Sequence, residues 1–114
     1  MGIVEVARGD VVLMIVPSDL GRPRPGIVIQ ANELPPDLST ILICPISSDL
    51  REWRLLRPLI AVRPENGLRL PSQIMTDKLV ALRRDRIRRV IGHIDPETSE
   101  QLDRALLVVL GLTR

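Results

Sequence analysis

The sequence predicts a mainly β fold with helices (α+β), in which a small antiparallel barrel-like sheet is followed by a C-terminal amphipathic helix. Two observations predict it. Short apolar runs alternate with turns rich in Pro and Gly over most of the chain, which is typical of small sheets and barrels. The C-terminal segment instead places apolar side chains at helical spacing. The 114 residues suffice for one modest core, so we expect a single domain spanning 1–114.

Five apolar runs are expected to form the strands. The first, 11–16, follows Arg8-Gly9-Asp10 and ends at Pro17, and its short length and valines favour a buried strand over a helix. The other four runs are also bounded by turn residues: Gly26–Gln30, Ile41–Ile46, Leu59–Val62 and Gln73–Leu82.

The C-terminal helix has a clear start. Asp95 is a good N-cap residue and Pro96 suits the first helical position. Apolar residues then recur at helical spacing and a glycine follows them: Leu102, Ala105, Leu106, Val109, Leu110 and Gly111. We expect this helix to cover one face of the sheet.

The composition excludes several classes of protein. With 45% hydrophobic and 26% charged residues, the chain is not intrinsically disordered. Trp53 is the only aromatic residue, so modules that read bases on aromatic platforms are hard to build, and nucleotide contacts are expected to use charge and hydrogen bonds. A single cysteine, Cys44, suits a reducing compartment. No run reaches the roughly 18 apolar residues of a membrane span, so a cytoplasmic protein without a membrane partner is expected.

Charge is distributed unevenly along the chain. The net charge of +2 is only mildly basic, but the segment 83–89 contains five arginines, while acidic residues gather between Asp95 and Asp103. Such an arginine-rich segment either binds nucleic-acid phosphates or forms a solvated face.

Cleaving RNA without a metal requires a group that accepts the 2′-hydroxyl proton and a donor or cation near the phosphate. The only histidine, His93, has apolar neighbours and is more typical of a structural residue. Arg24 precedes Pro25-Gly26, and Ser47 and Ser48 end the third apolar run. A guanidinium can hold a phosphate and a hydroxyl can donate to it. The alternative is that the serines only form a turn and Arg24 is solvated.

Asp77 and Lys78 are further candidates. Asp77 follows apolar residues and is either a partly buried base with a raised pKa or a paired carboxylate at a strand end. Lys78 either attracts phosphate or is solvated. One His and one Cys cannot complete a zinc site, and the chain has no glycine-rich phosphate loop, so neither a metal nor a nucleotide cofactor is expected.

Several segments, taken in order and spacing, resemble MazF/PemK toxins over essentially the whole chain: Arg8-Gly9-Asp10-Val11, Arg24-Pro25-Gly26-Ile27-Val28-Ile29-Gln30, Pro45-Ile46-Ser47-Ser48, Leu70-Pro71-Ser72-Gln73-Ile74-Met75-Thr76-Asp77 and Ile91-Gly92-His93-Ile94. The resemblance implies an SH3-like barrel of the CcdB/MazF type and a homodimer whose interface groove receives single-stranded RNA. It further implies metal-independent cleavage of mRNA to 2′,3′-cyclic phosphate and 5′-hydroxyl ends, and silencing by a MazE-like antitoxin whose extended segment occupies the groove.

The resemblance also implies the site residues. Arg24 corresponds to an arginine that stabilises the transition state, Ser47 to a hydroxyl residue that positions or activates the phosphate, and Asp77 to a carboxylate assigned as base in some members. The RNA-binding residues are then expected at five positions: Arg22, Ser48, Lys78, Arg83 and Arg84.

The chain departs from the family in a shorter loop at 17–24, in Met75 where some members have arginine, and in Val80 where many do. Two alternatives are a CcdB-like toxin that binds gyrase without enzymatic activity, and an inactive SH3-like module that binds nucleic acid through its arginines. Arg24 and Ser47 favour the nuclease, and the ending Gly111-Leu112-Thr113-Arg114 lacks the Trp-Gly-Ile ending of CcdB.

Overall fold

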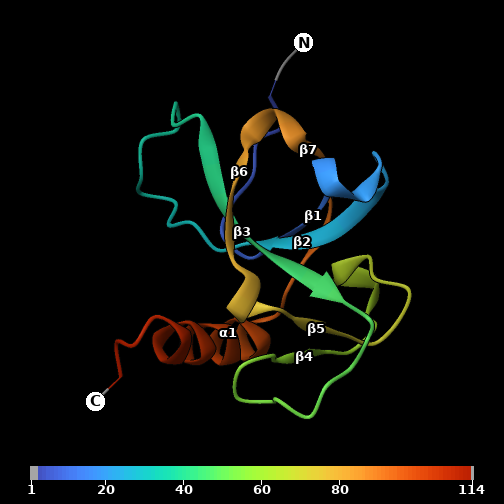
Figure 1. Cartoon of the computed structure of the whole chain (residues 1–114), viewed down its shortest axis with the longest axis vertical. Helices are drawn as coiled ribbons and strands as arrows, with labels where there is room; N and C mark the ends of the chain where they lie inside the picture. Colours follow the sequence, from blue (N-terminus) through green and yellow to red (C-terminus); the bar gives the residue numbers. More distant parts are fainter. Residues whose placement is uncertain (1–2, 114) are drawn as a thin grey trace.

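The computed structural model describes residues 3–113, so positions 1, 2 and 114 of the expected domain lie outside the described residues. Seven antiparallel strands form one strongly curled sheet, and a single α-helix lies against it (Figure 1). The strand order is β4-β5-β3-β2-β1-β7, with β6 also paired to β3. The elements are β1 (Asp10–Ile15), β2 (Pro23–Val28), β3 (Thr40–Ser47), β4 (Leu59–Ile60), β5 (Ser72–Ile74), β6 (Val80–Arg83), β7 (Ile87–His93) and α1 (Pro96–Val109).

Four short 3-10 helices connect the strands: η1 (Pro17–Asp19), η2 (Pro64–Asn66), η3 (Thr76–Lys78) and η4 (Arg84–Arg86). The α+β fold with a curled sheet and a C-terminal helix is confirmed, with a half-barrel in place of a closed barrel. The first three predicted strands correspond to β1, β2 and β3, although β2 already begins at Pro23. The predicted strand at 59–62 is shorter, since β4 has only two residues.

Strand β3 links the two parts of the sheet. Its first half pairs with β6, its middle residues 43–45 pair with β2, and its last residues, Ile46 and Ser47, pair with β5. The strand therefore passes from one set of neighbours to another along its length. This places the end of β3, with Ser47 and Ser48, at the junction of the two parts.

One strand prediction was wrong, and one strand was not predicted. The run Gln73–Leu82 is not one strand but β5 and β6 separated by η3. The chain turns there because the side chains of Thr76 and Asp77 bind the segment 51–57, at Leu56 and Arg57, and cannot do so from an extended strand. The arginine-rich segment contains a strand, β7, that was not predicted. Its pairing with β1 shifts register twice, so its side chains lack the simple alternation that predicts strands.

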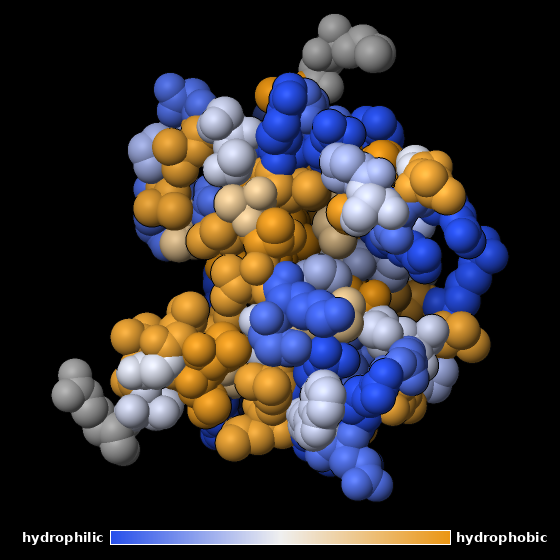
Figure 2. Space-filling model, in the orientation of Figure 1, coloured by the Kyte–Doolittle hydropathy of each residue, from blue (hydrophilic) through white to orange (hydrophobic). Residues whose placement is uncertain are grey.

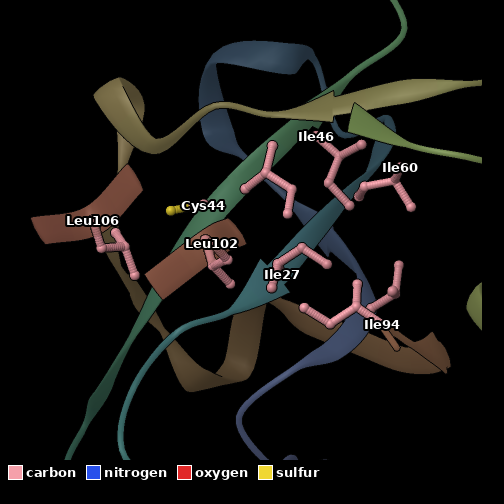
Figure 3. Packing of buried hydrophobic residues seen from close by; sticks show 9 residues of the cluster. Ile27, Cys44, Ile46, Ile60, Ile94, Leu102 and Leu106 are labelled. Atoms are coloured by element: carbon pink, nitrogen blue, oxygen red, sulfur yellow. The ribbon is translucent and has the colours of Figure 1, made fainter. Parts of the chain in front are cut away.

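The core consists of two apolar clusters on either side of the sheet. Consecutive residues Val11 and Val12 fall in different clusters because side chains alternate along a strand. The first cluster lies between the sheet and α1, where Leu102 and Leu106 meet Ile27 and Cys44 (Figure 3). The core is therefore built from aliphatic side chains. Burial raises the pKa of the Cys44 thiol to about 12.

Helix α1 starts where the sequence predicts. The Asp95 side chain accepts a hydrogen bond of 2.7 Å from the Thr98 backbone N–H, and this bond lowers the pKa of the Asp95 carboxyl. Leu102, Ala105 and Leu106 are buried as expected. Leu110 was predicted on the same face but is 55% exposed, because the helix ends at Val109. Over residues 3–113, no helix is long and apolar enough to cross a membrane.

Candidate active site

A groove of about 1020 Å³ lies between the β1–β2 loop, the end of β3 and the segment 67–70. The polar residues along it come from distant parts of the chain: Asp19, Arg24, Ser47, Ser48, Asp49, Arg69, Lys78 and Arg89 are among its lining residues. Four of these side chains are cationic and two are carboxylates. The groove thus has an excess of positive charge, which suits a polyanionic strand.

Arg24 lies near the start of β2, and Ser47 is the last residue of the neighbouring strand β3. The pairing of β2 with β3 sets Gly26 opposite Pro45 and ends there. Beyond it, Arg24 pairs with Met14 of β1 and Ser47 with Gln73 of β5. Both residues line the groove. A guanidinium and a hydroxyl are therefore available to one bound group.

Arg24 is held by an acidic partner in the short loop before β2. Its Nε donates a hydrogen bond of 3.1 Å to Oδ2 of Asp19, which belongs to η1. The chain then reverses through Leu20 and Gly21, both in the left-handed region with φ of 55° and 80°. This ion pair orients the guanidinium at the edge of the groove, although the Arg24 side chain remains half-exposed to solvent. Arg22 lies in the same loop, and its backbone N–H donates to the Asp19 carbonyl.

The two serines form a turn and also line the groove. The Oγ of Ser47 accepts a hydrogen bond of 3.0 Å from the Asp49 backbone N–H. A hydroxyl that accepts one bond still has its own proton to donate. The turn therefore fixes the Ser47 side chain and leaves its donor free for a phosphate oxygen, while Ser48 follows directly along the groove wall.

Of the two alternatives for Asp77, the structure agrees with a paired carboxylate and not with a base of raised pKa. Both of its oxygens accept hydrogen bonds of 2.9 Å from the guanidinium of Arg57. This bidentate pair lowers the pKa of the Asp77 carboxyl and raises the pKa of Arg57. An ionised carboxylate held in this way is a poor proton acceptor at neutral pH. Lys78, the next residue, reaches the groove.

The structure divides the predicted RNA-binding residues. Ser48 and Lys78 line the groove, but Arg83 and Arg84 lie elsewhere. Arg83 pairs with Asp85, and Arg84 donates to the carbonyl of Leu38 and lines a different cavity. Two arginines that were not among the five expected RNA-binding positions, Arg69 and Arg89, line the groove instead. Arg89 belongs to the arginine-rich segment, so its charge was noted, but its position depends on the pairing of β7 with β1.

His93 lines a separate cavity of about 290 Å³ together with Arg63, Glu65 and Asp95. It is the last residue of β7, and the cavity lies at the start of α1. Nothing in this arrangement connects the imidazole with Arg24 or Ser47. Within residues 3–113, no three His, Cys, Asp or Glu side chains lie together as metal ligands would.

Comparison with known proteins shows the family of the chain. Residues 7–110 match the family of PemK-like, MazF-like toxins of type II toxin-antitoxin systems. The chain belongs to this family. It is 32% identical over 92 residues to a probable endoribonuclease MazF of Mycolicibacterium smegmatis, which covers 81% of this chain and 84% of that protein.

Solved structures share the fold of this toxin family member. Mycobacterium tuberculosis toxin MazF-mt6 superposes with a TM-score of 0.78 at 20% identity, covering 92% of this chain and 99% of the other. A mycobacterial endoribonuclease solved in complex with its cognate antitoxin gives 0.79 at 18% identity, with coverage of 96% and 99%. A MazE-MazF structure from Deinococcus radiodurans gives 0.77 at 14% identity, with coverage of 95% and 97%.

In this MazF/PemK toxin, the segment 71–77 anchors the loop that leaves the groove. The side-chain amide of Gln73 donates to the carbonyls of Arg51 and Arg57, both at 3.0 Å, and its oxygen accepts from the Arg51 N–H at 2.6 Å. The Thr76 hydroxyl donates to the Leu56 carbonyl. Together with the pair of Asp77 and Arg57, these bonds fix the loop 48–58 beside the end of β3.

Proposed function

We propose that the chain is the toxin of a type II toxin-antitoxin system and a metal-independent endoribonuclease that cuts single-stranded mRNA in the groove at Arg24 and Ser47. The observation that carries this proposal is that Arg24 and Ser47 line one groove with an excess of positive charge. The relationship to a probable endoribonuclease MazF supports the same activity.

The reaction needs only atoms of the RNA and these side chains. The 2′-oxygen attacks the adjacent phosphorus, the bond from phosphorus to the 5′-oxygen breaks, and a 2′,3′-cyclic phosphate and a 5′-hydroxyl result. The proton lost from the 2′-hydroxyl is balanced by the proton gained at the 5′-oxygen. Negative charge grows on the phosphoryl oxygens in the transition state, where fixed donors are most effective. Arg24 supplies a cation that stays protonated, and Ser47 supplies a hydroxyl donor.

Asp77 takes a positioning role in this proposal in place of the role of base. Its carboxylate is occupied by Arg57, which fixes the loop next to Ser47 and Ser48. Lys78, Arg69 and Arg89 line the groove, and none of them takes part in an ion pair within residues 3–113. We assign them to the RNA phosphates, with Ser48 and Arg22 flanking the cleaved position. We do not assign Arg83 and Arg84 to RNA binding, because they do not line the groove.

The partners follow from the family and from the surface. A related endoribonuclease has been solved with its cognate antitoxin, and we propose that a MazE-like antitoxin binds this groove in competition with RNA. Apolar surface covers α1 and continues onto β3 and β6 (Figure 2), and exposed residues there include Leu42, Val80, Leu107 and Leu110. We assign this face to a homodimer, which sedimentation at micromolar concentration tests. The site of action is the cytoplasm, where mRNA is available.

The decisive experiment is cleavage of a long unstructured RNA in the presence of EDTA, with the cut ends mapped. The wild type should give discrete cuts that end in cyclic phosphate, and Arg24→Ala and Ser47→Ala should lose about 100-fold or more of the rate, as expected when a transition-state donor is removed. Arg104→Ala and Ser99→Ala, on helix α1, are the matched controls and should cut normally. Intact RNA with the wild type would instead indicate a toxin or module that acts by binding alone.

A further inference from the structure

The only aromatic side chain of the protein is exposed on the loop that follows the groove-lining residues Ser48 and Asp49. Trp53 lies in this loop, 48–58, six residues after Ser47, and is 53% exposed. A large indole normally contributes to a core or an interface, and here more than half of it faces solvent. Trp53 is absent from both apolar clusters of the core, and the guanidinium groups of Arg51 and Arg57 lie over its ring.

The loop that presents Trp53 is rigidly attached. Gln73 holds the backbone at Arg51 and Arg57 on either side of the tryptophan. The Trp53 carbonyl itself accepts hydrogen bonds from the backbone N–H groups of Leu56 and Arg57, at 3.1 and 2.7 Å. A side chain on such a loop is already in place before a ligand arrives, so little conformational entropy is lost on binding.

Two arginines connect the indole to the groove. The Cζ of Arg57 lies 5.0 Å from the ring centroid, and this guanidinium is 8% exposed and fixed by Asp77. The Cζ of Arg51 lies 5.9 Å from the centroid, and its Nη2 is 2.7 Å from Oδ2 of Asp49, a groove-lining residue. Arg51 is half-exposed and can swing away, whereas Arg57 cannot. The fixed guanidinium of Arg57 therefore packs on the indole. Arg51, which pairs with Asp49, links the indole to the groove-lining residues Ser48 and Asp49.

We propose that Trp53 is a stacking platform for an unpaired nucleobase of the RNA strand as it leaves the groove past Ser48 and Asp49. The inference rests on the proposed ribonuclease function and adds a base-binding subsite to it. Every base has a π-face, so stacking on an indole contributes affinity and fixes the strand with little choice of sequence. The neighbouring guanidinium of Arg51, once displaced from the ring, can meet the phosphate of the stacked nucleotide. The expectation that nucleotide contacts use only charge and hydrogen bonds would then be incomplete.

Trp53 also provides the test, because it is the only tryptophan and its emission reports this site alone. The probe is a fluorescently labelled 2′-O-methyl RNA that spans a mapped cut and cannot be cleaved because its 2′-oxygen is blocked. Binding is followed by polarisation of the label, and Trp53 by its emission and its accessibility to acrylamide. Saturable quenching of the emission and loss of acrylamide access are expected.

Variants separate a stacking role from a structural one. Trp53→Leu should weaken binding of the probe by about five- to a hundredfold, as loss of one stacked base does. It should raise KM for cleavage with kcat unchanged, because the indole does not touch the reacting phosphate. Trp53→Phe keeps an aromatic face and should bind the probe with most of the wild-type affinity. Urea unfolding checks that both variants are as stable as the wild type. If they are and Trp53 has only a structural role, Trp53→Leu and Trp53→Phe should bind the probe equally well.

Three results would overturn the proposal. If polarisation shows binding while Trp53 emission and accessibility stay unchanged, the subsite is wrong and the nuclease remains. If Trp53→Leu binds and cleaves like wild type, the subsite is equally wrong. If the wild type neither binds the probe nor cleaves RNA, both the subsite and the proposed function fail together.

Discussion

The guanidinium of Arg57 donates from Nε and Nη2 to both carboxylate oxygens of Asp77, at 2.9 Å each. The Arg57 side chain is 8% exposed and that of Asp77 27% exposed, so the guanidinium is buried while the carboxylate is partly open to water. It joins η3 to the end of the loop 48–58, which leads from the groove. The hydrogen bonds between Arg57 and Asp77 therefore connect the loop 48–58 to η3.

Asp77→Asn should therefore destabilise the fold, because it leaves the buried guanidinium of Arg57 without its anion. We expect the free energy of unfolding at pH 7 to fall by about 2 kcal/mol, less than for a fully buried pair because Asp77 is partly exposed. The pKa of Asp77 is lowered in the folded state, so its contribution is fully present above the unfolded pKa of about 3.9 and is lost as pH falls through the folded value. Urea unfolding of both proteins at pH 7 and in acid measures this difference.

The matched control is Asp103→Asn, which removes an exposed carboxylate paired with Arg8. It should change the free energy of unfolding by less than about 1 kcal/mol. A penalty for Asp77→Asn that stays constant from neutral pH into acid would contradict an ionised, paired Asp77.

Much of the fold could be predicted because its signals are local. Asp95 and Pro96 mark the start of α1 whatever the rest of the chain does, and prolines and glycines separate the first strands. The errors arise where distant residues decide. The run 73–82 bends because Thr76 and Asp77 bind residues twenty positions earlier. The sequence of β7 lacks the regular alternation of a strand because its pairing with β1 shifts register twice.

The site shows the same division. The resemblance pointed to Arg24 and Ser47 because each sits in a short segment whose order is preserved, and both line the groove. Arg69 was missed, and Arg89 was not distinguished from its neighbouring arginines, because only the folded sheet brings the 67–70 segment and β7 to the same groove. The direction of the Asp77 pKa shift stayed open for a related reason: the apolar neighbours of Asp77 are visible in the sequence, while its partner Arg57 is not.

Asp19 should act through Arg24. Because its carboxylate orients the guanidinium at 3.1 Å, Asp19→Asn is expected to lower kcat about three- to tenfold. KM should stay unchanged or fall, because Asp19→Asn removes a negative charge that repels RNA from the groove. In an Arg24→Ala background the same substitution should leave kcat unchanged, because residues that act as a unit are not additive. Equal effects of Asp19→Asn in both backgrounds would show that Asp19 acts independently of Arg24.

Two arginines of the same segment should differ in RNA binding. Arg89 lines the groove, whereas Arg83 pairs with Asp85 away from it. Arg89→Ala should weaken binding of the uncleavable RNA and reduce the slope of log affinity against log salt by about 0.7, the value for one lost phosphate contact on a single strand. Arg83→Ala removes the same charge from the chain and should alter neither quantity. Equal losses for both variants would mean that only overall charge matters.

Gly92 is required where β7 crosses η2. A Cβ at this position would lie 2.3 Å from the carbonyl oxygen of Glu65 and 2.6 Å from Cα of Asn66, and both are backbone atoms that cannot rotate away. Gly92→Ala should therefore push η2 outward and lower the free energy of unfolding by about 2–3 kcal/mol, as overpacking does. The segment 67–70 that follows η2 forms a wall of the groove, so the activity of the folded fraction should fall as well.

Gly21→Ala separates this steric effect from the backbone preference of glycine. Gly21 has a φ of 80°, but nothing lies within 4 Å of a Cβ placed there. The strain of a left-handed alanine alone should lower the free energy of unfolding by about 1 kcal/mol. Urea unfolding compares the two variants, and RNA cleavage by the folded fraction shows whether the groove wall has moved. If Gly92→Ala is as stable as Gly21→Ala, then η2 moves away from the added methyl group without cost. The position of the groove wall at 67–70 would then depend on other contacts.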